Sequence, residues 1–253
     1  MMNQQISVVI NTYNASKYLA RVLDTVKSFD EIVVCDMEST DNTIAIAHEY
    51  GCRIVTFPKA DHKSAEPART FAIQSATSDW VLVVDADELV SEALRTYLYD
   101  FIKEPGKIRG LYIPRKNYTM NVFLPSSYPD YQLRFFIKEG TIWPPHVHTF
   151  PTVQGLLSYI PKSRKDCAFE HLDDSTRATI NRLNNYTDNE VEKRAGQKVT
   201  FLKLFASPMI RFIKLYFIKG GIFYGIPGYV QAMRAAQYKF TALCKLYEKQ
   251  IGM

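Results

Sequence analysis

Short apolar runs alternate with helix-like segments through the first ninety residues of the chain. The runs cover residues 6–10, 31–35, 53–57 and 80–84, and each ends in polar residues. Short, mainly apolar runs such as these, of which residues 80–84 are apolar throughout, are typical of parallel strands that are buried on both faces. Because helices connect parallel strands, the polar residues after each run are expected along one edge of a sheet.

The segments between the runs carry helix signals. Apolar residues recur at helical spacing at Leu19, Val22, Leu23 and Val26. Residues 39–42 supply N-cap candidates for a second helix that Gly51 ends, and Pro67 suits the first turn of a third. The order β-α-β-α-β-α-β therefore predicts an α/β fold, with a mostly parallel sheet and helices on both of its faces.

Two carboxylates follow the fourth run, at Asp85 and Asp87. Side chains two residues apart in extended backbone share a face, so both can point into one site. Carboxylates this close repel each other unless a cation or hydrogen bonds compensate. Divalent ions such as Mg²⁺ take carboxylate and phosphate oxygens together, so the pair predicts a metal–nucleotide site. The alternative is a solvated acidic turn before a helix that begins near Ser91.

Glycine-rich phosphate loops do not occur in the sequence. It contains neither GxGxxG nor GxxxxGK followed by Ser or Thr, which argues against a dinucleotide site and against a P-loop. A nucleotide would therefore be held by side chains and a metal ion.

Four motifs in one order carry a family resemblance. Residues 12–14, 36–43, 68–69 and 85–88 together resemble the family 2 glycosyltransferases of the GT-A fold, and most of all the bacterial lipopolysaccharide-core β-1,4-glucosyltransferase type. The resemblance continues through 128–135, through Trp143 with His146 and His148, and through Glu170-His171. One departure is Thr149, which stands where the group has Glu, so the role of that Glu is not carried over.

The resemblance implies a set of donor-binding residues, with a nucleotide sugar as donor. They are Thr12, Tyr13, Asn14, Asp36, Lys63, Arg69, Asp85 and Ala86. Asp36 would accept a hydrogen bond from the nucleobase, and Asp85 would face the ribose. Arg69 would contact the diphosphate, since a guanidinium pairs well with phosphate oxygens. The alternatives are a helix-surface charge for Arg69 and a solvated loop residue for Lys63.

The same resemblance implies a metal and an acceptor side. Asp87 and His171 would bind Mn²⁺ or Mg²⁺, since neutral imidazole is a common metal ligand. The acceptor-side residues would be Arg134, Trp143, His146 and His148. Each of the histidines has the alternative of a hydrogen-bonded structural residue.

The implied reaction is attack of an acceptor hydroxyl on the anomeric carbon of the donor, with inversion. A carboxylate should take the hydroxyl proton. Asp130 is the first candidate because it lies in the acceptor-facing segment, and Glu170 is the second. Asp130 also has the alternative of a plain turn residue after Pro129.

The net charge of +5 hides an uneven distribution. Residues 193–253 contain eleven Lys or Arg and one acid, Glu248, within an aromatic and apolar segment. A basic, aromatic amphipathic helix is typical of an interfacial membrane element, so residues 201–219 are expected on an anionic membrane surface. A second helix is expected to carry an apolar face, with Gln231, Arg234, Lys245 and Lys249 elsewhere; the face comprises Tyr229, Val230, Met233, Ala236, Phe240, Leu243 and Tyr247. The segments Gly220-Gly221, Gly225 and Pro227-Gly228 are expected to separate the two helices. Packing on the catalytic domain or in a homo-oligomer is the alternative, and nucleic acid ranks behind both.

These patterns predict the organisation of the whole chain. Residues 1–192 would form the GT-A domain, with a donor half to about residue 104 and an acceptor half from about 105, and 193–253 a helical tail. Four scattered cysteines and no signal peptide before the first strand favour the cytoplasm, at the inner face of the membrane. The acceptor would be a glycan or a lipid-linked glycan. A sugar-phosphate nucleotidyltransferase and a non-catalytic sugar-nucleotide binder remain alternatives.

Overall fold

The chain forms two compact units in the computed structural model. Residues 4–62, 64–145, 149–173, 175–194 and 196–252 are described. The first unit comprises residues 1–116 and 129–172, and the second comprises 117–128 and 173–253. The domain boundary expected after residue 192 stays a prediction.

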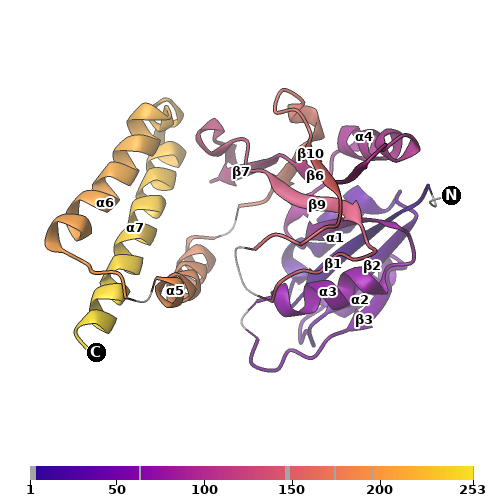
Figure 1. Ribbon diagram of the computed structural model, residues 1–253, viewed down its shortest axis with the longest axis horizontal. Helices are drawn as coiled ribbons and strands as arrows, with labels where there is room; N and C mark the ends of the chain where they lie inside the picture. The colour runs from indigo at the N-terminus through magenta and orange to yellow at the C-terminus, as the bar shows by residue number, and fades with distance from the viewer. Residues whose placement is uncertain (1–3, 63, 146–148, 174, 195, 253) are drawn as a thin grey trace. The chain divides into compact units, whose positions relative to one another are not determined.

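A mixed sheet of seven strands forms the centre of the first unit (Figure 1). In spatial order its strands are β10 (Leu156–Tyr159), β6 (Ile108–Ile113), β9 (Gln132–Ile137), β4 (Trp80–Asp85), β1 (Ile6–Thr12), β2 (Glu31–Asp36) and β3 (Arg53–Thr56). Only β9 runs antiparallel to its neighbours, β4 and β6. The predicted mostly parallel sheet is therefore confirmed, with one reversed strand that the apolar pattern did not reveal.

Helices cover both faces of this sheet, as expected. On one face lie α1 (Ser16–Val26), α2 (Thr43–Glu49) and α4 (Glu92–Lys103), which share a core with side chains such as Ile10 and Trp80. On the other face α3 (Glu66–Ser75) packs with Trp143 over alternate residues of β1, β2 and β4. The alternation follows from the strand period of two, and it makes the strands apolar on both sides.

Strand register brings the polar strand ends together at one edge. Asn11 is aligned with Asp85 of β4, and Thr12 is aligned with Asp36 of β2. The helix expected to begin near Ser91 is α4, and the Ser91 hydroxyl caps it by accepting from the Leu94 amide at 3.1 Å. The ends of β1, β2 and β4 are thus fixed relative to one another by backbone hydrogen bonds.

Two short strands connect distant parts of the first unit. β5 (Glu88–Leu89) follows β4 directly and pairs antiparallel with β11 (Phe169–His171), which comes after a 3₁₀ turn at Lys165–Cys167. The register aligns His171 with Glu88. This pairing carries His171 to the edge where β4 ends.

The second unit is mainly helical. The hairpin of β7 (Arg115–Thr119) and β8 (Val122–Phe123) enters it, followed by a 3₁₀ turn at Pro125–Ser127. The remaining elements are α5 (Thr176–Lys193), α6 (Phe201–Ile213), a π-helical turn at Lys214–Ile218, a 3₁₀ turn at Gly221–Tyr224 and α7 (Gly225–Gln250). α6 and α7 lie side by side as a hairpin (Figure 1). In the part of the chain that the structure describes, no helix is long and apolar enough to cross a membrane.

The packing of α7 differs from the expectation in two ways. The helix already begins at Gly225, so Pro227 and Gly228 lie in its first turn and do not separate the helices. The predicted apolar face is buried only in part: Ala236 and Leu243 are buried, whereas its large side chains Tyr229, Met233, Phe240 and Tyr247 are about half exposed. The other buried positions of the helix are Gly228, Ala232, Ala242 and Leu246. At the start of the helix the backbones are in close contact, because a Cβ on Gly228 would overlap the Gly221 carbonyl oxygen. Gly228 therefore allows this end of α7 to pack directly against the turn at Gly221.

Candidate active site

The end of β1 and the end of β2 form a preorganised polar cradle. Thr12 Oγ1 donates to Asp36 Oδ1 at 2.8 Å, and the Ser39 amide donates to Asp36 Oδ2 at 2.8 Å. Asn14 closes the loop, since its side-chain oxygen accepts from the Thr40 amide at 2.8 Å. Asp36 is buried, whereas the ring of Tyr13 beside it is half exposed. An ionised carboxylate held in this way can accept a further hydrogen bond from a flat polar ligand such as a nucleobase.

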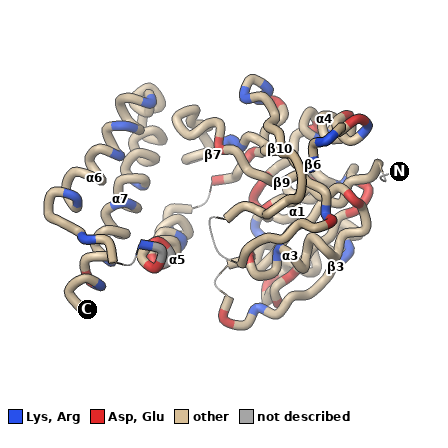
Figure 2. Tube along the Cα trace, in the orientation of Figure 1, with Lys and Arg blue, Asp and Glu red and all other residues tan. Residues whose placement is uncertain are grey.

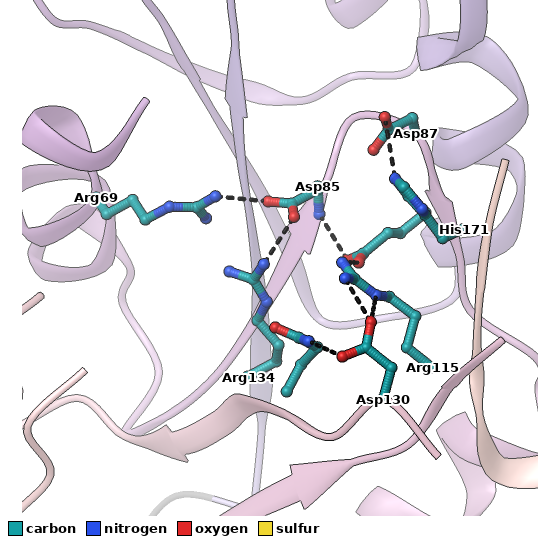
Figure 3. Close-up of polar contacts among 9 residues, drawn as sticks. Arg69, Asp85, Asp87, Arg115, Asp130, Arg134 and His171 are labelled. Atoms are coloured by element: carbon teal, nitrogen blue, oxygen red, sulfur yellow. Dashed lines mark hydrogen bonds and ion pairs between the residues drawn. The ribbon is translucent and has the colours of Figure 1, made fainter. Parts of the chain in front are cut away.

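Asp85 forms the centre of the site and is held by two arginines (Figure 3). Arg69 Nη2 donates to Asp85 Oδ1 and Arg134 Nη2 donates to Asp85 Oδ2, each at 2.7 Å. The two guanidinium groups lie over the ring of Trp143, at 4.6 and 5.0 Å from its centroid. Burial alone would raise the pKa of Asp85, but the charges of Arg134 and Arg69 outweigh burial and hold it well below its usual range.

Positive charge exceeds negative charge in this cluster. Arg69 and Arg134 are both buried, and among the described residues Nε and Nη1 of each have no hydrogen-bond partner. The Nε1 atom of Trp143 and both polar atoms of the Asn11 side chain are also buried without a hydrogen-bond partner among the described residues. Burial and the charge of Arg69 lower the pKa of Arg134, because Asp85 does not fully compensate them. The cluster is therefore suited to an additional anionic or oxygen-rich group.

Asp87 and His171 meet at the turn after β4. His171 Nε2 lies 3.4 Å from Asp87 Oδ2, and the Leu172 amide donates to the Asp87 carbonyl oxygen at 2.8 Å. Burial lowers the pKa of His171, but the hydrogen bond and charge of Asp87 outweigh it, so the net shift is upward. No third His, Cys, Asp or Glu completes a metal-binding group within the described ranges. A carboxylate and an imidazole are nevertheless a donor set that Mn²⁺ accepts, with phosphate oxygens completing the shell.

The two candidate bases have different surroundings. Arg115 donates twice to Asp130 Oδ2, at 3.0 and 2.7 Å, and Gln132 Nε2 donates to Asp130 Oδ1 at 2.9 Å. Glu170 Oε1 accepts from Lys116 Nζ at 3.2 Å. Both carboxylate side chains are about one third exposed, at 33% for Asp130 and 37% for Glu170. Each can therefore be reached from solvent.

The structure thus brings most of the predicted residues to one sheet edge. Ala86 lies in the turn between Asp85 and Asp87. Arg134, expected on the acceptor side, shares the Asp85 carboxylate with Arg69, which was expected on the donor side. Lys63, His146 and His148 lie outside the described residues.

Sequence reasoning missed three polar residues in this region: Asn11, Glu88 and Arg115. Asn11 could have been found, because it is the first polar residue after an apolar run and precedes the Thr12 motif. Glu88 was visible as the third carboxylate of its cluster but received no role. Arg115 left no local signal, because its partners are distant along the chain.

The comparison with protein families gives one match, to glycosyl transferase family 2, over residues 7–159. This range contains the whole central sheet apart from the first residue of β1. It also contains all predicted site residues except Glu170 and His171.

Whole-chain relatives agree with this match. An uncharacterised glycosyltransferase of Rickettsia conorii is 26% identical over 99% of this chain and 92% of its own length. The lipopolysaccharide core biosynthesis glycosyltransferase LpsC of Rhizobium meliloti is 25% identical over 96% of this chain and 92% of its own. The crystal structure of Staphylococcus aureus TarS 1-349 in complex with UDP covers 98% of this chain and 92% of that chain, at 14% identity and a TM-score of 0.51. That likeness concerns the fold, and the GT-A-type α/β fold expected from the motifs is confirmed.

Proposed function

The chain belongs to glycosyl transferase family 2, and we propose that it transfers a hexose from a UDP-sugar to a hydroxyl group of a glycan or lipid-linked acceptor. The observation that carries this proposal is the sheet edge where Asp36, Asp85 and Asp87 meet. It offers a carboxylate cradle, an electropositive cluster and a carboxylate–imidazole pair in one place. The carboxylate cradle suits a nucleobase, the electropositive cluster suits a diphosphate, and the carboxylate–imidazole pair suits a divalent metal ion.

In this proposal the donor is held by side chains from three strand ends. Thr12, Tyr13 and Asn14 line the nucleobase, and Asp36 accepts a hydrogen bond from the uracil N–H. Asp85 keeps lone pairs for the ribose hydroxyls although both of its oxygens already accept from arginines. The excess positive charge of Arg69 and Arg134 attracts the diphosphate. Lys63 remains part of the proposed set.

A divalent cation, Mn²⁺ or Mg²⁺, is part of the proposal. Asp87 and His171 would hold it together with diphosphate oxygens, and it would stabilise the charge that develops on the leaving diphosphate. His171 Nε2 lies 3.4 Å from Asp87 Oδ2, so the two side chains are close enough to contact one cation together.

The reaction proposed is a single displacement with inversion. The acceptor oxygen forms a bond to the anomeric carbon while the bond from that carbon to the diphosphate oxygen breaks. The electron pair of the broken bond leaves with UDP, and the hydroxyl proton passes to a carboxylate. Asp130 is the first candidate for this base and Glu170 the second. Trp143 and Arg134, with His146 and His148, remain proposed for the acceptor side.

The acceptor is proposed to belong to cell-envelope polysaccharide, in a β-1,4-glucosyltransferase-type reaction of lipopolysaccharide-core synthesis. The relative LpsC, which carries that pathway in its name, supports this assignment. We also propose that the protein works at the cytoplasmic face of the membrane. Exposed apolar side chains on the α6–α7 hairpin, such as Phe201 at 84% and Phe223 at 87% exposure, support a membrane contact. Lys and Arg line the same helices, with few acids among them (Figure 2).

The decisive experiment supplies the purified protein with Mn²⁺, a panel of UDP-sugars and a core oligosaccharide acceptor. Release of UDP with a new glycosidic bond, and inversion seen by NMR, would support the proposal. Asp87→Ala should abolish turnover and weaken UDP binding while the fold stays intact. Pyrophosphate release from a nucleoside triphosphate and a sugar phosphate would instead identify a nucleotidyltransferase. UDP binding without any turnover would identify a non-catalytic binder.

Membrane attachment is tested with vesicles. The protein should sediment with vesicles that contain phosphatidylglycerol and not with pure phosphatidylcholine. Binding should weaken at 1 M salt, where the Debye length is about 3 Å. Replacing Arg211, Lys214 and Lys219 by Glu should release it, whereas Glu at Lys27, Lys103 and Lys107 of the first unit should not. Equal binding to both vesicles, or a dimer in solution that the first triple variant dissolves, would favour protein packing instead.

A further inference from the structure

Arg115, the first residue of β7, divides its side-chain N–H groups between two carboxylates. Nε and Nη2 donate to Asp130 Oδ2, at 3.0 and 2.7 Å, and Nη1 donates to Glu88 Oε1 at 2.9 Å. The Glu88 side chain is fully buried and that of Arg115 is 18% exposed. The guanidinium group is therefore fixed from two directions by groups that lie far from it along the chain.

Hydrogen bonds continue from both of these carboxylates. Glu88 Oε2 accepts from the backbone amide of Asp85 at 3.2 Å. Asp130 Oδ1 accepts from Gln132, and the Arg115 amide donates to the Asp130 carbonyl oxygen at 3.1 Å. An unbroken series of contacts thus connects the backbone at the end of β4 with the carboxylate of Asp130 (Figure 3).

The opposite charges of Arg115 and its two carboxylate partners stabilise each other. Burial lowers the pKa of Arg115, but Glu88 and Asp130 outweigh burial, so the net shift is upward and the guanidinium stays charged. Glu88, with no exposure to water, needs such a partner because an unpaired buried carboxylate is costly. A lysine could not reproduce the arrangement, because a single ammonium lacks the planar fork that serves two carboxylates at once.

We infer that Arg115 is a positioning residue that holds the Asp130 carboxylate in a fixed place relative to the strand end carrying Asp85 and Asp87. The inference rests on the proposed function, with Asp130 as the base. A base of this kind must meet the acceptor hydroxyl opposite the bond that breaks. Misplacement by about 1 Å can cost about a hundredfold in rate. Arg115 supplies the alignment by tying the base to the donor side of the site.

The test is a double-mutant cycle that uses the full-length protein, Mn²⁺, a UDP-sugar and the acceptor. Arg115→Lys should lower kcat by about tenfold to a hundredfold, with the donor KM and the calorimetric Kd for UDP nearly unchanged. Asp130→Asn should lower kcat by about a hundredfold or more. In the Asp130→Asn background, Arg115→Lys should have no further effect, because its action passes through Asp130.

Two further variants serve as a control and as a second test. Arg109→Lys on β6 is the matched control and should keep full kcat, since among the described residues Arg109 donates to the backbone carbonyls of Gly106 and Ile108 and not to a carboxylate. Gln132→Met removes the hydrogen bond from Gln132 to Asp130 without touching buried Glu88. It should lower kcat by a smaller factor, and again only when Asp130 is present. This variant decides the question if Arg115→Lys does not fold.

Each outcome has a distinct meaning. A wild-type protein that binds no UDP and transfers no sugar contradicts the proposed function itself. Normal transfer by the wild type, with full kcat in Arg115→Lys, overturns the inference alone. The inference is also overturned if the effects of Arg115→Lys and Asp130→Asn on kcat are additive in the double variant. A loss of UDP affinity together with a lower melting temperature in Arg115→Lys overturns it as well, because each result assigns Arg115 a role that does not pass through Asp130.

Discussion

The charge imbalance around Asp85 leads to an unusual prediction for stability. Two buried guanidinium groups, of Arg69 and Arg134, share one carboxylate. Removing Asp85 should therefore be far more damaging than removing one arginine. Asp85→Asn removes the carboxylate that both guanidinium groups contact directly, and the charges of Glu66 and Glu88 compensate Arg69 only in part. Breaking a buried ion pair in this way costs about 3–5 kcal/mol.

Arg134→Met should change the free energy of unfolding much less. It removes one charge-assisted hydrogen bond of about 1.5–3 kcal/mol and a contact with the Trp143 ring of about 2 kcal/mol. It also removes two buried donors without partners, Nε and Nη1, each of which costs about 1–3 kcal/mol. These contributions nearly cancel, and Arg69 with Asp85 remains as a balanced pair. The expected gap between the two variants is about 2 kcal/mol or more.

Urea unfolding measured by tryptophan fluorescence and by far-UV circular dichroism provides the assay, with Arg69→Met as the matched variant from the other side of Asp85. Either arginine alone should be dispensable for stability, whereas Arg69→Met with Arg134→Met should be strongly destabilising. If Arg134→Met cost as much as Asp85→Asn with an unchanged m-value, the two arginines would not be in excess. The reasoning on the cluster would then be wrong.

Further predictions concern other parts of the molecule. Gly228→Ala should lower the melting temperature of the protein by several degrees, because its Cβ would overlap the Gly221 carbonyl; a variant as stable as wild type would contradict the close contact. Mn²⁺ affinity, measured by calorimetry, should fall as the pH drops through the raised pKa of His171, because only neutral imidazole binds a metal ion; His171→Ala should remove this step. Burial raises the pKa of Cys35 to about 12 and that of Cys52 to about 11, so at pH 8 iodoacetamide should label the half-exposed Cys244 first, as mass spectrometry would show. Hydrogen bonds from Ser16 and Thr43 outweigh the effect of burial and lower the pKa of Asp41 to about 2, so its contribution to stability should be present above pH 4 and lost as the pH falls toward 2; Asp41→Asn should flatten this part of the acid-unfolding curve.

The first half of the fold was predictable from sequence because its signals are local. Each of the four apolar runs became a strand, and the register of β1, β2 and β4 placed Thr12, Asp36 and Asp85 as the α/β rule requires. Capping was less predictable. Asn42 occupies the N-cap position of α2 without a side-chain hydrogen bond, and the neighbouring Asp41 accepts from the Thr43 amide instead.

The parts that escaped prediction depend on contacts between distant residues. The reversed direction of β9 and the pairing of β5 with β11 have no periodic signature, so the sharing of Asp85 by Arg69 and Arg134 could not be foreseen. The packing of α7 was predictable only in part. Ala236 and Leu243 of the predicted apolar face are buried, whereas Tyr229, Met233 and Phe240 are about half exposed. Hydrophobic periodicity also gives no sign of the close backbone contact between Gly228 and Gly221.

The segment 117–128 has a practical consequence for anyone who wishes to express the sheet alone. It interrupts the first unit between Lys116 and Pro129 and belongs by its contacts to the helical unit. Its Ser126 carbonyl accepts from Lys219, and its hydroxyl donates to Gln231. A chain ending at Leu172 would lose both partners and would uncover the buried Leu124, so we expect such a fragment to aggregate. A useful minimal sheet protein requires a short polar turn in place of 117–128 as well as the truncation.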